Sequence, residues 1–211
     1  MKYFAGILLA ALLAIAPAFA QAPKGWKYRS DHSSQASDPD APGAIKFTTT
    51  PTGFHAVNPM AAVYWNPANT ASGNYTLKGT FKLIKSNGED EYYGLIFGGS
   101  ALEGPTQSYL YFMVTDDGTY LIKRRDGSST EGVSSKTPSP AVKKPDASGQ
   151  ATNALEVRVM ADKVAFVING TVVTTLPKTG PAGKTDGIYG MRINHQLDVQ
   201  IDNFGVSKML S

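Results

Sequence analysis

The chain has 211 residues, no cysteine and a formal net charge of +3. Its longest basic run is Lys123-Arg124-Arg125, which argues against nucleic acid as a partner, because nucleic-acid-binding domains carry a clustered basic surface. Without cysteine the domain has no disulfide, so buried apolar side chains and sheet hydrogen bonds must stabilise it.

Residues 1–20 have the pattern of a secretory signal peptide. Lys2 precedes an apolar stretch from Phe4 to Ile15, and Ala18-Phe19-Ala20 is a small-x-small cleavage site. The apolar stretch is shorter than the roughly 20 residues that a transmembrane helix needs, and no later segment approaches that length. We therefore expect a secreted or periplasmic protein with no membrane span after cleavage.

Residues 21–43 are rich in Ser, Asp, Pro and Ala and show no apolar periodicity, which predicts a lead-in loop along the domain edge. Trp26 and Tyr28 are expected to pin this loop to the body, because two buried aromatic rings offset the entropy lost on ordering a few residues. The folded domain is then predicted to span residues 44–211, which is enough chain for one large all-β unit.

Strand follows strand from residue 44 onward. Apolar side chains alternate with polar ones over residues 75–83, and Leu155, Val157 and Val159 alternate in the same way, which is typical of half-buried strands. Residues 92–99 and 109–114 are apolar on both faces and are predicted to lie centrally in a sheet or under a covering segment.

Three tight turns connect these strands into predicted hairpins: Asp116-Asp117-Gly118, Ala161-Asp162-Lys163 and Asn169-Gly170. The polar stretch from Asp126 to Gln150 is predicted to be a long loop. Because no sustained helical periodicity occurs after residue 20, we expect about a dozen strands in an all-β fold, a two-sheet antiparallel jelly-roll β-sandwich.

Two motifs carry a resemblance to a known superfamily. Val167-Ile168-Asn169-Gly170 resembles the F-x-V-N-G hairpin of laminin-G-like modules, and Ile201-Asp202-Asn203-Phe204 resembles their closing strand. Over residues 44–206 the chain is similar to the concanavalin A-like lectin/glucanase sandwiches, and it looks closest to a bacterial domain of unknown function related to 3-keto-disaccharide hydrolases. The resemblance implies the fold, while no residue pattern in this chain carries the hydrolase activity.

The carboxylate pattern of sandwich glucanases, E-x-D-x-(x)-E on one strand, is missing from the sequence. The best-spaced alternative is Asp198, Gln200 and Asp202, which share one face of the closing strand. Asp198 or Asp202 is a candidate catalytic acid, but the same alternation is typical of the outward polar face of a half-buried strand. In the superfamily pattern Asp202 is a structural residue at the strand end.

Metal sites are not indicated by the histidines. His32, His55 and His195 have no spacing that is typical of metal ligands, so we predict no zinc site. A structural calcium ion held by loop carboxylates would need no recognisable spacing, and that alternative stays open.

Polar and aromatic side chains form the candidate ligand site. Arg192, Asn194 and His195 converge toward the end of one strand, where they can donate hydrogen bonds to sugar hydroxyls or only satisfy backbone groups. Tyr109 and Tyr111 share one side of their strand and, with Trp65, are candidates for stacking on a sugar, although such rings also fill ordinary cores.

Three functions remain open from the sequence. The first is a non-catalytic module that binds a glycan or another polyhydroxylated ligand on its concave sheet through Trp65, Tyr109, Tyr111, Arg192 and His195. The second is a secreted glycoside-cleaving enzyme that uses Asp198 or Asp202. The third is an envelope interaction or scaffold module.

Overall fold

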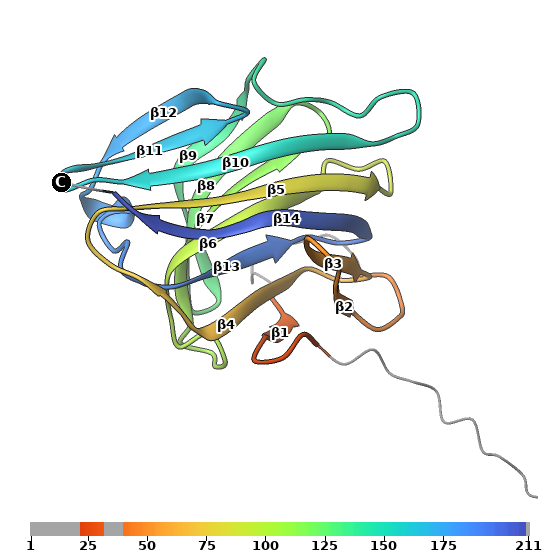
Figure 1. The fold of residues 1–211 in the computed structure, drawn as a ribbon, viewed down its shortest axis with the longest axis horizontal. Coiled ribbons are helices and arrows are strands. Elements are labelled where there is room, and N and C mark those ends of the chain that lie inside the picture. The colour runs from red at the N-terminus through yellow and green to blue at the C-terminus, as the bar shows by residue number, and fades with distance from the viewer. Residues whose placement is uncertain (1–21, 32–39, 210–211) are drawn as a thin grey trace, which may run out of the picture.

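The computed structural model describes residues 22–31 and 40–209, so the predicted signal peptide lies outside the described residues. Within this part of the chain, strands account for nearly all of the regular structure, and one 3₁₀ helix, η1 (Gly180–Ala182), accompanies them (Figure 1). None of the helices described is long and apolar enough to span a membrane. The strands are β1 (Lys27–Ser30), β2 (Lys46–Thr49), β3 (Gly53–Asn58), β4 (Ala62–Ala71), β5 (Tyr75–Lys85), β6 (Tyr92–Ser100), β7 (Ser108–Thr115), β8 (Thr119–Asp126), β9 (Ser129–Pro138), β10 (Ala151–Val159), β11 (Lys163–Ile168), β12 (Thr171–Pro177), β13 (Gly187–Ile193) and β14 (Leu197–Lys208).

The strands form two antiparallel sheets of seven strands each, which confirms the predicted β-sandwich. The first sheet has the order β1-β4-β13-β6-β7-β8-β9, and the second has the order β12-β11-β10-β5-β14-β3-β2. The doubly apolar strands β6 and β7 lie inside the first sheet, as predicted. Figure 1 shows the second sheet in front, with the chain passing repeatedly from one sheet to the other.

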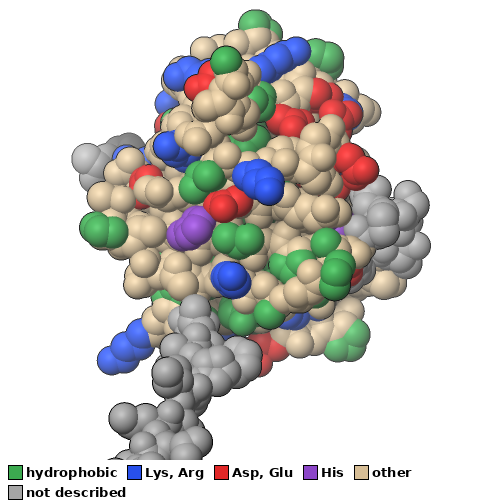
Figure 2. Space-filling view, turned by 90° about the vertical axis from the view of Figure 1, so that its right-hand side faces the viewer, with side chains coloured by type: hydrophobic (Ala, Val, Ile, Leu, Met, Phe, Trp, Pro, Cys, Tyr) green, Lys and Arg blue, Asp and Glu red, His purple; other side chains and the backbone are tan. Residues whose placement is uncertain are grey.

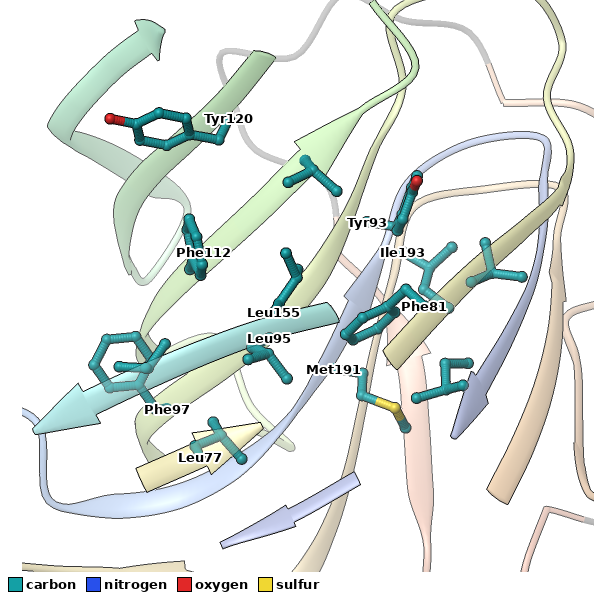
Figure 3. Close-up of a cluster of buried hydrophobic side chains, with 14 of the residues drawn as sticks. Leu77, Phe81, Tyr93, Leu95, Phe97, Phe112, Tyr120, Leu155, Met191 and Ile193 are labelled. Carbon is teal, nitrogen blue, oxygen red and sulfur yellow. The ribbon is translucent and has the colours of Figure 1, made fainter. Parts of the chain in front are cut away.

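The main core fills the space between the sheets (Figure 3). Phe112 of the first sheet packs edge-on against Phe166 of the second, with ring centroids 5.1 Å apart. Leu155, Val157 and Val159 are all buried, which confirms the period-two pattern of β10. Sheet-on-sheet packing of this kind removes one row of side chains per strand from water.

The predicted hairpins are present between β7 and β8, β10 and β11, and β11 and β12. In the last of these, Asn169 and Gly170 have φ angles of 49° and 84°, as a type I′ turn requires. The side chain of Asn169 also accepts a hydrogen bond from the Ala154 amide at 2.9 Å. The turn is therefore fixed by backbone preference and by a contact to the neighbouring strand β10.

Two predicted loops contain strands. The prediction of one long loop from Asp126 to Gln150 is wrong, because β9 occupies Ser129–Pro138 and pairs with β8. As an edge strand with mostly exposed or half-buried side chains, β9 has no apolar row to reveal it. The lead-in segment 21–43 likewise contains β1, which pairs with β4. Trp26, just before β1, packs on Phe54 with ring centroids 4.5 Å apart.

Candidate functional site

The outer face of the first sheet is unusually apolar. In an antiparallel sandwich the face that does not meet the other sheet is ordinarily wet and polar. Here it carries a second cluster of buried side chains that is separate from the main core. Strand register aligns these residues across the sheet, with Val63 opposite Arg192 and Ile96 opposite Tyr111. The cluster consists of Val63, Trp65, Ile96, Leu102, Tyr109, Tyr111, Met113 and Leu121.

The carboxylate of Asp31 lies on this face, and cationic and polar groups surround it. Arg192 and the Tyr109 hydroxyl both donate to its Oδ2. Gln107 Nε2 donates to Oδ1 at 2.6 Å, and Arg125 Nη2 lies 3.1 Å from the same oxygen. We call Asp31, Gln107, Tyr109, Arg125 and Arg192 the arginine cluster. Through Asp31, which directly follows β1, the arginine cluster joins that strand to β7, β8 and β13.

In the arginine cluster, attraction between opposite charges, together with hydrogen bonds, has a larger effect on the pKa values than burial has. Burial raises the pKa of Asp31, but Arg192, the Tyr109 hydrogen bond and Arg125 outweigh it and hold that pKa below its ordinary value. Burial lowers the pKa of Arg192, and its interactions with Tyr109 and Asp31 outweigh this effect and raise it. The cluster therefore contains an ionised carboxylate between two guanidinium groups. A third, Arg29 Nη2, lies 3.5 Å from Asp31 Oδ1.

Four of the predicted ligand residues meet on this face. Tyr109 and Tyr111 lie side by side with ring centroids 5.7 Å apart, and the Arg192 guanidinium sits 5.4 Å from the centre of the Tyr111 ring. Trp65 belongs to the same outer cluster. Tyr109 and Trp65 are at most 2% exposed, so they form the floor of this face. The accessible groups of the site therefore lie beside these rings.

Asn194 and His195 are placed differently. The backbone N–H of Asn194, which directly follows β13, donates to the Tyr92 carbonyl at 2.9 Å. His195 is buried, and its Nδ1 lies 2.8 Å from Asp40 Oδ1. The acidic partner of His195 is thus Asp40 in the lead-in segment, whereas Arg192 pairs with Asp31.

An open hollow of about 370 Å³ lies along β1 and β4, and Arg29, whose Nη2 is 3.5 Å from Asp31 Oδ1, is among its lining residues. Tyr28 is one of the two large hydrophobic residues that the described chain exposes, at 37%. Lys27 pairs with Glu103 at 2.5 Å on the rim, and the Arg29 Nε donates to the Leu102 carbonyl. Aromatic surface beside hydrogen-bonding charges is the composition that sugar sites use. The lining residues are Ala22, Trp26, Lys27, Tyr28, Arg29, Trp65 and Glu103.

The candidate catalytic acids lie on the other sheet. Asp198 Oδ1 is 2.6 Å from His55 Nε2, across the β14 and β3 pairing. Asp202 accepts hydrogen bonds from Thr52 and from Gln200 Nε2, the latter at 2.9 Å. The two carboxylates thus point to different partners on the outer face of the second sheet, away from Trp65, Tyr109 and Tyr111.

Sequence reasoning missed Asp31, Arg29 and Arg125 as members of the site. Asp31 stands in a Ser- and Asp-rich stretch with no periodicity, so nothing in the pattern marks it as buried. For Arg125, the pairing of β7 with β8 was a usable signal, because the turn between these strands was predicted correctly. Arg125 is opposite Tyr109 in this hairpin, so its side chain lies on the same face as the Tyr109 ring. In the described ranges, no three His, Cys, Asp or Glu side chains gather as a metal site would require.

Acidic and basic side chains are interspersed on the end of the sandwich shown in Figure 2. Among the described residues on that face, no large area carries a single charge.

Comparison with solved structures shows which known fold this chain has. The fold is that of a galectin-like β-sandwich. The chain is similar to the carbohydrate-binding module CBM66 from Bacillus subtilis, with a TM-score of 0.64 and 9% identity over 87% of this chain and 96% of that one. A Bacillus subtilis protein of unknown function with a galectin-like fold gives a TM-score of 0.62 and 15% identity over 88% and 90%.

A third similar structure is the cellulose-induced protein Cip1, with a TM-score of 0.51 and 12% identity over 87% of this chain and 91% of that one. No protein-family profile matches the sequence. A search of curated proteins also finds no match. At these identities the likeness establishes the fold, and function must be argued from the site itself.

Proposed function

We propose that this domain is a secreted or periplasmic module that binds carbohydrate in the hollow beside β1 and β4. The observation that carries the proposal is the lining of that hollow, where Trp26, Tyr28 and Trp65 lie next to Lys27, Arg29 and Glu103. Aromatic rings offer an apolar face to the C–H side of a sugar ring, and the charged groups offer hydrogen bonds to its hydroxyls.

The arginine cluster supports this site from the side. Buried hydrogen bonds between Asp31, Tyr109 and Arg192 fix β1 to the middle of the first sheet. A binding site needs this rigidity, because ordering mobile side chains on binding costs affinity. In this proposal Trp65 lines the hollow, whereas Tyr109, Tyr111, Arg192 and Asn194 are not among its lining residues. Tyr109 and Arg192 act indirectly, because they bind Asp31 and so hold β1 in place. His195, buried against Asp40, makes no direct contact with the ligand in this arrangement.

The fold is consistent with this proposal, since one similar structure is itself named a carbohydrate-binding module. Glycoside cleavage is the less favoured alternative, because Asp198 and Asp202 are engaged by His55, Thr52 and Gln200 on the opposite sheet. If the domain had the activity of 3-keto-disaccharide hydrolases, we would expect turnover that depends on one of these carboxylates.

The test is a glycan array followed by titration calorimetry on the domain without residues 1–20. We expect Tyr28→Ala to weaken binding of any glycan hit by roughly tenfold, which corresponds to about 1.4 kcal/mol for a lost ring contact. Tyr28→Phe keeps the ring and should keep the affinity. The matched control is Val172→Ala, since Val172 is the other exposed large hydrophobic residue and lies on β12.

Two results would overturn the proposal. One is an array that shows no glycan bound by the folded domain. The other is a hit whose affinity is the same in the Tyr28→Ala variant as in the parent. Release of reducing ends from the same glycans, abolished in Asp198→Asn or Asp202→Asn, would instead favour the hydrolase.

A further inference from the structure

A second cationic site lies at the end of β8, and Arg124 is its centre. This side chain belongs to a residue that is only 7% exposed. Arg124 Nη2 donates to the Ser108 hydroxyl at 2.7 Å, while Nη1 reaches the carbonyls of Pro181 and Lys184 at 3.3 and 3.4 Å. Its partners in the described chain are therefore neutral oxygens, and two of the three contacts are long.

No carboxylate forms an ion pair with Arg124 among the described residues, in contrast to Arg192 and Arg125. Burial lowers the pKa of Arg124, and the nearest acidic influences, Asp126 and Glu131, oppose that shift from exposed positions. A buried guanidinium that no carboxylate contacts is only partly compensated by acidic groups farther away, and an anion that binds beside it reduces that cost.

The space for such an anion is present. A cavity of about 420 Å³ opens beside Arg124, and Lys178 and Lys184 also line it. Two acidic residues, Asp126 and Asp186, also line it, against the three basic ones, and Asp186 accepts a hydrogen bond from the Gly73 amide at 3.2 Å. The full lining is Gly98, Ser100, Ser108, Arg124, Asp126, Lys178, Gly183, Lys184, Thr185 and Asp186.

Local backbone geometry builds this cavity. Gly98 in β6 has a φ angle of +60°, and a Cβ atom there would lie 2.3 Å from the Lys184 carbonyl oxygen. Glycine at this position lets the segment around Lys184 lie against the first sheet, where it forms one wall. The Ser108 hydroxyl accepts from Arg124, which leaves its own proton for donation to a ligand.

We propose that this cavity binds a small oxyanion, in the form of a phosphate, sulfate or carboxylate group, through the guanidinium of Arg124 and the Ser108 hydroxyl, with Lys178 and Lys184 at the mouth. The shared chemistry is a compact group of negatively charged oxygens, which charge-assisted hydrogen bonds recognise well. The site shares no lining residue with the hollow beside β1, so it does not depend on the proposed function.

The experiment is a titration of the folded domain with inorganic sulfate, inorganic phosphate and glucuronate, and glucose is the neutral control. Calorimetry and NMR measure the binding. The parent protein should bind at least one anion saturably, and more weakly as sodium chloride is raised. Arg124→Gln should weaken this binding by about tenfold or more. Arg158→Gln is the matched control, because Arg158 pairs with Glu156 on the second sheet, and should leave binding unchanged.

The double variant Lys178→Gln plus Lys184→Gln keeps the buried guanidinium and removes only rim charges, so it decides the matter if Arg124→Gln fails to fold. We expect it to weaken anion binding about threefold or more. Preference for glucuronate over the inorganic ions would assign the group to an acidic sugar, and the reverse order would assign it to a free ion. Absence of saturable binding by all three anions, or equal affinity in the parent and these variants, overturns the proposal.

Discussion

At the scale of single residues, the burial of Asp31 explains how the N-terminal strand is held. This residue is 1% exposed, and its carboxylate lies against Arg192, Arg125, Tyr109 and Gln107. This carboxylate and its guanidinium partners stabilise the fold only together, because loss of the carboxylate leaves the guanidinium groups of Arg125 and Arg192 buried without their ion-pair partner.

Replacing this carboxylate by a neutral isostere gives a direct test. We expect Asp31→Asn to lower the free energy of unfolding at pH 7 by about 3–5 kcal/mol, measured by urea denaturation. Asp162→Asn, at an exposed turn, is the control and should change it little. An unchanged stability in Asp31→Asn would show that the arginine cluster does not hold β1.

The depressed pKa of Asp31 also predicts how the stability difference between the parent and Asp31→Asn depends on pH. Because the folded-state pKa of Asp31 is depressed, its stabilising contribution is complete above the ordinary aspartate value of about 3.9 and is lost as pH falls through the folded-state pKa. The stability gap between the parent and Asp31→Asn should therefore be full at pH 7 and shrink below about pH 4. A gap that stays constant as the pH is lowered through this range would contradict the assignment.

The residue scale also shows how far the sequence predicts the site. Alternation placed Tyr109 and Tyr111 on one face, and the Gly-rich strand pattern pointed to Arg192, because each is set by local periodicity. Asp31 could not be found in this way. Its burial depends on pairing between β1 and β4, which are separated along the chain and carry no local sign of their register.

At the scale of elements, strands with a local periodic pattern were predicted, and strands that depend on pairing with a distant segment were missed. Strands β5, β7 and β10 bury one row of side chains against the other sheet, and in β5 and β10 the sequence alternates accordingly. Strands β1 and β9 lie at the two edges of the first sheet and bury little. An edge strand forms because its neighbour offers free backbone hydrogen-bonding groups. For β1 and β9 these neighbours are β4 and β8, so the sequences of β1 and β9 themselves do not reveal the strands.

The β11 and β12 hairpin tests the turn chemistry at this scale. Gly170 has a φ angle of +84°, and a Cβ atom added there would meet only open space, so Gly170→Ala should cost about 1–2 kcal/mol through backbone strain alone. Asn169→Gly keeps the backbone freedom but loses the side-chain bonds to Ala154, Ala141 and Asn153. Thermal or urea unfolding measures both. Asn169→Gly as stable as the parent would show that these bonds contribute nothing.

At the scale of the whole molecule, the order of strands predicts that the domain unfolds as one unit. The chain alternates between the two sheets, so that β1 and β4 enter the first sheet while β2, β3 and β5 enter the second. Neither sheet can be completed by a continuous part of the chain. The core between them contains side chains from both, as Figure 3 shows. Loss of packing anywhere in that core should therefore destabilise distant strands.

The two tryptophans make this prediction measurable, because Trp26 and Trp65 both report on the β1 and β4 edge of the first sheet. Phe112 lies in β7 and packs on Phe166 across the core. Phe112→Ala should cost about 3–5 kcal/mol through the cavity it leaves. If the sandwich is one cooperative unit, the variant moves the tryptophan-fluorescence midpoint and the circular-dichroism midpoint by the same amount of urea. A fluorescence midpoint that stays at the parent value while the circular-dichroism midpoint falls would mean that the β1 and β4 edge, with its proposed sugar site, unfolds independently of the core.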